Sequence, residues 1–254
     1  MRVKLGESMA QSNFSKFQQS QRLISALFWL LSAIYIYILL LSPPQQLLPG
    51  EPIWAVQPET LKEIVNESIN FFFILPFLNA VGIESMQAPI VHPWIESLFN
   101  FAEAWIFMFL PLLLLDSKGR ELPKIIIWSL AMFLTNTFLL PYMAWRFTVT
   151  DVQTEETQTK GLLAKIFGLI GLIIGTTSIA WAFLARPEFG DIAARSEFFV
   201  QNLMSNRVTI AFCIDVVLFY IFQIILMGSL EPVESPKRGL RFVPFWGLAI
   251  WLIL

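Results

Sequence analysis

One apolar run of the sequence carries a stripe of polar side chains that could do chemistry. The stripe holds the only histidine of the chain, two carboxylates and an amide, at His92, Glu96, Asn100 and Glu103. At about 100° per residue, these four side chains lie within about 60° of one another on a helix. An ionised carboxylate at the bilayer centre costs about 2.5–3.5 kcal/mol, so such groups face protein, pair or take up a proton. We therefore expect the stripe to face the interior of a helical bundle, with Glu103 near mid-membrane.

A second polar segment, with Glu67 and Asn70, precedes the stripe. If the two segments form an antiparallel hairpin, the helical rise places Asn70 within about one turn of Glu103, and Glu67 about 8 Å further along. Glu67, Asn70, Asn100 and Glu103 would then share one buried polar pocket. Such a pocket either joins helices by hydrogen bonds or carries function, and both interpretations stay open.

Asp215 and Gln223 form a further candidate site, about seven and fifteen residues into a later apolar run. The two side chains lie nearly on the same face of a helix. Asp215 is expected either to pair with an arginine near a helix end or to accept a proton. The two residues are therefore a candidate proton or ion-pair site.

Metal and cofactor expectations follow from one histidine and one cysteine. A di-iron bundle needs Glu-x-x-His motifs from two helices, so no metal site is predicted. His92 could contact a chlorophyll-like ring as a single axial ligand, or cap the helix that begins beside it. The cofactor is unknown, and a bound lipid or pigment stays open. The 24 Phe and nine Trp residues are explained by lipid contact and interfacial anchoring alone.

The elements that must position these residues follow from composition. Apolar residues make up 56% of the 254-residue chain and charged residues 14%, against about 25% charged in soluble domains. The chain therefore needs lipid as solvent, and without a long basic block it is not expected to bind nucleic acid. Five runs reach the roughly 20 residues that a spanning helix needs. They are residues 23–41, 93–115, 125–145, 162–184 and 208–227.

Two further segments are uncertain spans. Residues 61–83 begin with polar side chains, and residues 242–254 offer only 13 positions. With both included, the fold class is an all-α integral membrane protein, a bundle of about seven transmembrane helices. Residues 1–22 form a polar, basic N-terminal segment, and residues 23–254 form a single transmembrane domain. With seven spans, Lys and Arg divide ten to seven between the two sides, which predicts a cytoplasmic N-terminus.

Smaller features concern packing and loops. Small residues line one face of the run at 162–184, which predicts close packing against a neighbouring helix. They are Gly168, Gly171, Gly175 and Ser178. Residues 187–191 either cap a short interfacial helix at 192–204 or belong to a simple surface loop. Residues 151–160 are polar and expected to be aqueous.

Several stretches resemble an uncharacterised group of cyanobacterial and chloroplast multi-pass membrane proteins. They are residues 71–76, 92–100, 133–136, 183–190 and 243–248. The resemblance implies a thylakoid membrane or the plasma membrane of a cyanobacterium, and a connection with photosynthesis. It assigns no catalytic residue.

Three functions are compatible with these observations. The first is a non-enzymatic accessory or assembly component that contacts lipids and the subunits of other, photosynthetic, membrane complexes. It is favoured because the Gly-x-Ser-x-Gly, His-Glu-x-x-His and phosphate-loop motifs are missing from the sequence. The second is a small proton-coupled carrier that uses Glu103 and Asp215. The third is an intramembrane enzyme acting on a lipid or isoprenoid with Glu67 and Glu103.

Overall fold

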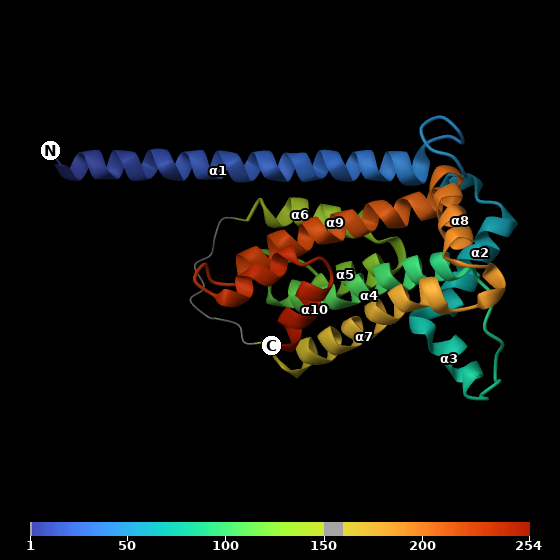
Figure 1. Ribbon diagram of the computed structural model, residues 1–254. Helices are drawn as coiled ribbons and strands as arrows, with labels where there is room; N and C mark the ends of the chain where they lie inside the picture. The colour runs from blue at the N-terminus through green and yellow to red at the C-terminus, as the bar shows by residue number, and fades with distance from the viewer. Residues whose placement is uncertain (1, 150–159) are drawn as a thin grey trace.

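The computed structural model describes residues 2–149 and 160–254, and the regular elements in those ranges are all helices (Figure 1). Four of them are long and apolar enough to cross a membrane. They are α1 (Arg2–Tyr35) with its π-helical continuation η1 (Ile36–Leu41), α4 (Pro93–Leu115), α7 (Leu162–Leu184) and α9 (Arg207–Leu230). The all-helical class is confirmed. The seven-helix bundle is not, because the other apolar stretches form shorter helices.

Helix α4 is the centre of the bundle. In its apolar stretch 72% of the residues are buried, against 22% in α1. Helices α5, α7 and α9 pack around it. On α7, a Cβ atom at Gly171 would collide with Met108 of α4, so a small residue is needed for this close approach. Of the polar stripe, Glu96, Asn100 and Glu103 are buried in protein, as expected, whereas His92 is half-buried.

Residues 124–146 do not form one spanning helix. They form two 11-residue helices, α5 (Lys124–Leu134) and α6 (Asn136–Arg146), separated by Thr135 with φ 41° and ψ −118°. The Lys124 ammonium donates to the Asp116 carbonyl at the end of α4, and Arg146 binds the Asp116 carboxylate. Both outer ends of the pair therefore lie at the same end of the bundle.

Each of these helices is about 16 Å long, half of a bilayer core of about 30 Å. The pair is a re-entrant hairpin, with its tip at Thr135 inside the bundle. The prediction of a span at 125–145 is wrong because the backbone reverses at Thr135, where neither glycine nor proline announces a turn.

The C-terminal segment forms a second hairpin of this kind. The 3-10 helix η6 (Pro236–Phe242) is followed by α10 (Trp246–Ile253), and the chain reverses at Phe245, whose φ is 58°. At the outer ends, Lys237 donates to the carbonyl of Leu254. The eight residues of α10 return toward the end from which η6 entered, so residues 242–254 do not span.

Residues 58–80 also stop short of a span. Helix α2 (Pro58–Ile69) and helix α3 (Ile74–Ala80) are separated by the short turn η3 (Phe71–Phe73). In this turn Phe72 and Phe73 both have positive φ, 53° and 56°, which is costly for bulky residues. Three further short helical turns are η2 (Ile53–Ala55), η4 (Ser117–Gly119) and η5 (Pro187–Phe189).

The four long helices divide the molecule into two ends. One, called the α8 end, holds residues 42–92 and residues 185–206. Figure 1 shows α2, α3 and α8 (Ile192–Ser205) gathered there. The other, called the terminal end, holds residues 116–123, residues 231–235 and the C-terminus. Helix α8 confirms the short helix and not the simple surface loop, and its N-cap is Asp191, which accepts from the Ala194 amide. Most of the loop expected to be aqueous, residues 151–159, lies outside the described residues.

Candidate functional site

A cavity of about 640 Å³ extends from the α8 end to the tip of the α5–α6 hairpin. Helices α1, α2, α4 and α9 supply its walls. Most of the lining is apolar, for example Leu39, Phe99 and Phe212. Its deep part is polar, with the side chains of Tyr35, Glu103, Thr135 and Asp215. The volume lies within the range of about 300–1,000 Å³ typical of small-molecule sites.

Asp215 lies where three elements meet. Its carboxylate, on a side chain only 2% exposed, accepts hydrogen bonds from the Tyr35 hydroxyl at 2.6 Å and from the Asn136 amide at 2.7 Å. The Tyr35 and Thr135 hydroxyls are 3.0 Å apart. Asn136 is also the first residue of α6, whose N-terminus presents a partial positive charge. Asp215 therefore holds the hairpin tip. The ion pair with an arginine that had been one expectation is not formed among the residues that the structure describes.

Glu103 lies in the same cavity. Its side chain is 4% exposed, and its Oε2 atom has no hydrogen-bond partner within the described part of the chain. A buried carboxyl oxygen without a partner is costly. Either a proton or a bound ligand can offset that cost. The cavity thus contains one acid held by hydrogen bonds and one acid that is free to interact with a ligand.

A second cavity, of about 300 Å³, lies at the α8 end and is called the vestibule here. It is lined by polar residues of α2 and α8 such as Glu63 and Asn202, and it shares Glu67 with the deep cavity. Burial, the nearby Glu63 and then Glu96 raise the pKa of Glu67 to about 8. Glu67 therefore stands between the vestibule and the acids at mid-bundle.

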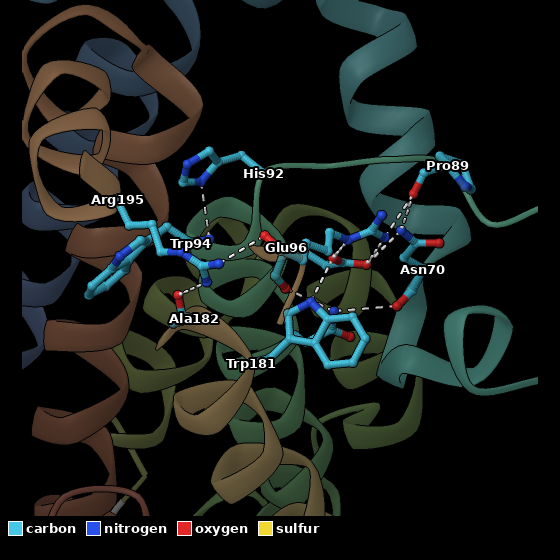
Figure 2. Close-up of polar contacts among 10 residues, drawn as sticks. Asn70, Pro89, His92, Trp94, Glu96, Trp181, Ala182 and Arg195 are labelled. Carbon is cyan, nitrogen blue, oxygen red and sulfur yellow. Dashed lines mark hydrogen bonds and ion pairs between the residues drawn. The ribbon is translucent and has the colours of Figure 1, made fainter. Parts of the chain in front are cut away.

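Asn70, Glu96 and Asn100 form a latch between helices and are not part of the cavity lining. Figure 2 shows Asn70 beside Glu96. Glu96 accepts from the Asn70 amide at 2.6 Å. Asn100 donates to the backbone carbonyls of Asn70 and Glu96 and accepts from the Phe72 amide at 2.5 Å. Asn100 thereby caps a backbone N–H that the break between α2 and α3 would leave unpaired.

The latch extends to α7. Trp181 donates to Glu96 Oε2 at 2.8 Å, and Arg186 forms an ion pair with the same oxygen at 3.2 Å. Glu96 is fully buried, and a buried carboxylate persists when it is paired and hydrogen-bonded. The predicted single pocket is therefore divided: Asn70, Glu96 and Asn100 join helices, whereas Glu67 and Glu103 face the cavities.

His92 takes up the N-cap of α4. Its Nδ1 accepts from the Trp94 amide at 3.3 Å, and its ring stacks on Phe198 with centroids 3.6 Å apart. Burial, helped by Arg195, lowers the pKa of His92 to about 4. The imidazole is thus neutral at physiological pH and lines the vestibule, as a cap and an aromatic wall.

Gln223 and the small residues of α7 are packing residues. Gln223 accepts from Trp105 at 3.2 Å and donates to the backbone carbonyls of Arg241 and Val243, so it holds the C-terminal hairpin and not Asp215. The four residues of the small face are buried. A Cβ atom on Gly175 would collide with the Phe245 ring. The predicted helix-packing face thus receives both α4 and the C-terminal hairpin.

Five residues of the site and the latch were not singled out from the sequence: Tyr35, Thr135, Asn136, Trp181 and Arg186. Asn136 lies in the stretch 133–136 and Arg186 in the stretch 183–190, both of which contribute to the family resemblance. Tyr35 sits in an apolar run with other aromatic residues. Nothing in its local sequence distinguishes it.

Together, fold and site define a helical, multi-pass membrane protein with two half-length hairpins entering from one end and a carboxylate-containing cavity reached from the other. The chain matches no known family model, no curated protein and no solved structure. The resemblance to cyanobacterial and chloroplast proteins stays a prediction.

Proposed function

We propose that the protein is a proton-coupled carrier of a small organic molecule, which binds in the cavity between Glu103 and Asp215. The observation that carries this proposal is the Oε2 atom of Glu103, which has no hydrogen-bond partner among the described residues, on a buried side chain that lines a cavity of about 640 Å³. Ionisable groups inside membrane proteins mark substrate pathways and proton relays. The geometry thus favours the carrier over the accessory role.

Coupling follows from the cost of an unpaired charge. A carboxylate in a low-dielectric site is neutralised by a proton or by a ligand. Binding of one therefore competes with binding of the other, and the exchange links two gradients. Asp215, whose carboxylate already accepts two hydrogen bonds, tolerates ionisation better than Glu103. Glu103 is accordingly the proposed exchange site.

The charge distribution supports an orientation. Thirteen of the 17 Lys and Arg residues belong to segments at or near the terminal end, and four to segments at the α8 end. The four are Lys62, Arg186, Arg195 and Arg207. By the positive-inside rule the terminal end faces the cytoplasm. The vestibule then opens to the opposite compartment, in the plasma membrane or thylakoid of the proposed cyanobacterial source.

The other two functions receive less support. Glu67 and Glu103 do share a cavity, but two carboxylates alone specify no reaction on a lipid or isoprenoid. The exposed apolar surfaces of α1 and α7 suit lipid as well as partner subunits. Association with photosynthetic complexes therefore stays a prediction.

Proteoliposomes test the carrier. Three fluorescent probes of different charge, ethidium, Nile red and 8-anilinonaphthalene sulfonate, are followed under an imposed pH gradient. We expect gradient-driven movement of at least one probe above the rate in protein-free liposomes. Glu103→Gln should abolish it, while Glu197→Gln, on the exposed surface of α8, should retain it. Movement of no probe, or unchanged movement in Glu103→Gln, would refute the carrier.

A further inference from the structure

The charged residues that line the deep cavity are predominantly acidic. Its described lining contains Glu51, Glu67, Glu103 and Asp215, and Arg207 is the only basic residue among them. Glu51 is already occupied, since its Oε2 accepts from the Gln57 amide and from the Thr60 hydroxyl. Glu67 and Glu103 remain to interact with a ligand, and Asp215, which already accepts two hydrogen bonds, lies at the deep end of the cavity.

Arg207 offers little to an anion. Its guanidinium donates to the carbonyls of Ser42 at 2.9 Å, Pro49 at 3.1 Å and Leu48 at 3.3 Å. These bonds fasten the loop before η2, and Gly50 with φ 75° packs directly on the arginine. Because the N–H groups of Arg207 donate to backbone carbonyls, the guanidinium stabilises the loop and is not available to a ligand in the cavity.

The walls of the cavity favour an apolar body with a weakly hydrated charge. Phe71, Phe99 and Phe212 are among the lining residues, and aromatic faces attract cations. An anion in the same place would face acids and the negative faces of aromatic rings. The described residues include no group of three or more His, Cys, Asp or Glu side chains that could hold a metal ion.

The vestibule favours the same charge on the way in. Glu63 and Glu67 line it together with the amides of Asn202 and Asn206. A carboxylate in a cleft concentrates the opposite ion from solution. Because the pKa of Glu67 is raised to about 8, a cation that binds beside Glu67 competes with its proton. Because Glu67 borders both cavities, a cation leaving the vestibule meets one acid before it reaches Glu103.

We infer that the ligand is an organic cation with a bulky apolar body, which enters from the α8 end past Glu67 and binds between Glu103 and Asp215. This inference rests on the proposed function, whose substrate class it names. An anion is disfavoured because its charge would be buried beside carboxylates.

Two probes of equal shape and opposite charge test the inference: tetraphenylphosphonium and tetraphenylborate. Binding to the full-length protein is measured by equilibrium dialysis in detergent, with protein-free micelles subtracted. We expect saturable binding of tetraphenylphosphonium alone. Glu103→Gln should weaken it by about tenfold to a hundredfold, the loss expected for one charged contact. Glu197→Gln should bind like the wild type.

The comparison of the two probes on the wild type needs no variant, so it holds even if a substitution fails to fold. Equal or tighter binding of tetraphenylborate, or saturable binding of neither probe, would overturn the inference. Tetraphenylphosphonium binding without gradient-driven movement of any fluorescent probe would refute the carrier and leave the ligand class standing. Gradient-driven movement of a fluorescent probe together with a preference for tetraphenylborate would refute the ligand class and leave the carrier standing.

Discussion

The clamp between Asp116 and Arg146 gives the sharpest test of the α5–α6 hairpin. Arg146 donates from Nε to Oδ2 and from Nη2 to Oδ1 of Asp116, both at 2.8 Å, and each side chain is 1% exposed. Tyr142 adds a hydrogen bond to the same carboxylate at 2.6 Å. The clamp joins the end of α4 to the end of α6. The variants to compare are Asp116→Asn, Arg146→Gln and the double substitution.

Removing one partner of a buried ion pair costs about 3–5 kcal/mol, because the other charge stays buried without compensation. Removing both partners also removes the stranded charge. The double variant should therefore be more stable than the sum of the single effects predicts, by about 2 kcal/mol. If residues 124–146 instead formed one straight helix, Arg146 would lie about 34 Å further along the bundle, and the two substitutions would not couple.

Reversible unfolding in mixed detergent and dodecyl sulfate micelles, followed by tryptophan fluorescence, gives the three free energies of unfolding. Asp116→Asn combined with Glu197→Gln on α8 serves as the matched pair without contact, and its effects should add. Additivity of the Asp116 and Arg146 effects within about 0.5 kcal/mol would refute the clamp and, with it, the hairpin topology.

Three further predictions concern packing and protonation. The pKa of His92 falls from 6.5 to about 4 on folding; since folding excludes a proton, stability should decline as the pH falls from 6.5 toward 4, and His92→Gln should flatten that decline in thermal unfolding. Gly175→Leu should lower the free energy of unfolding by about 1–3 kcal/mol because its side chain meets an aromatic ring, whereas Gly161→Ala, with nothing within 4 Å, should not. Asn100→Ala removes the acceptor for the Phe72 amide, so hydrogen exchange of that amide should accelerate by at least about tenfold; unchanged exchange would contradict the latch.

The spanning helices α4 and α7 could be read from the sequence because their signals are local. Both agree with the predicted ranges, 93–115 and 162–184. At α4, Pro93 occupies the first turn, His92 caps it and the polar Asp116 follows the last apolar residue. A continuous apolar run flanked by such residues is stable in lipid as a membrane-spanning helix.

The hairpins could not be read in this way. Residues 125–145 have the length and apolarity of a span, and the reversal depends on contacts distant in sequence: Asn136 with Asp215, and Arg146 with Asp116. In lipid, irregular backbone is tolerated only where protein buries it. The burial of the turn at Thr135 depends on other helices. The residues of this segment alone therefore predict a span.

For the candidate site, the sequence predicted which face of α4 is buried, but not which residues the side chains on that face contact. The helical period correctly placed Glu96, Asn100 and Glu103 on a buried face, each 4% exposed or less. The helical repeat gives the face of the helix on which a side chain lies. It does not give the residue of a neighbouring helix that this side chain contacts. Glu96 and Glu103 are about 10 Å apart along the axis, enough for one to meet Arg186 and the other the cavity. The same argument separates Gln223 from Asp215, about 12 Å away.

In the proposed carrier, Asp215, the second acid of the deep cavity, holds the barrier. The α5–α6 hairpin enters from the terminal end and stops at mid-bundle, so its tip separates the deep cavity from that end. The tip is held by hydrogen bonds from Tyr35 and Asn136 to the Asp215 carboxylate, and hydrogen bonds to an ionised acceptor are about twice as strong as neutral ones. Protonation of Asp215 should therefore loosen the tip. Hydrogen exchange at residues 134–138, corrected for intrinsic rates, should therefore be faster in Asp215→Asn and in Tyr35→Phe than in the wild type. Equal corrected exchange in both variants and in the wild type would show that the Asp215 carboxylate does not hold the tip.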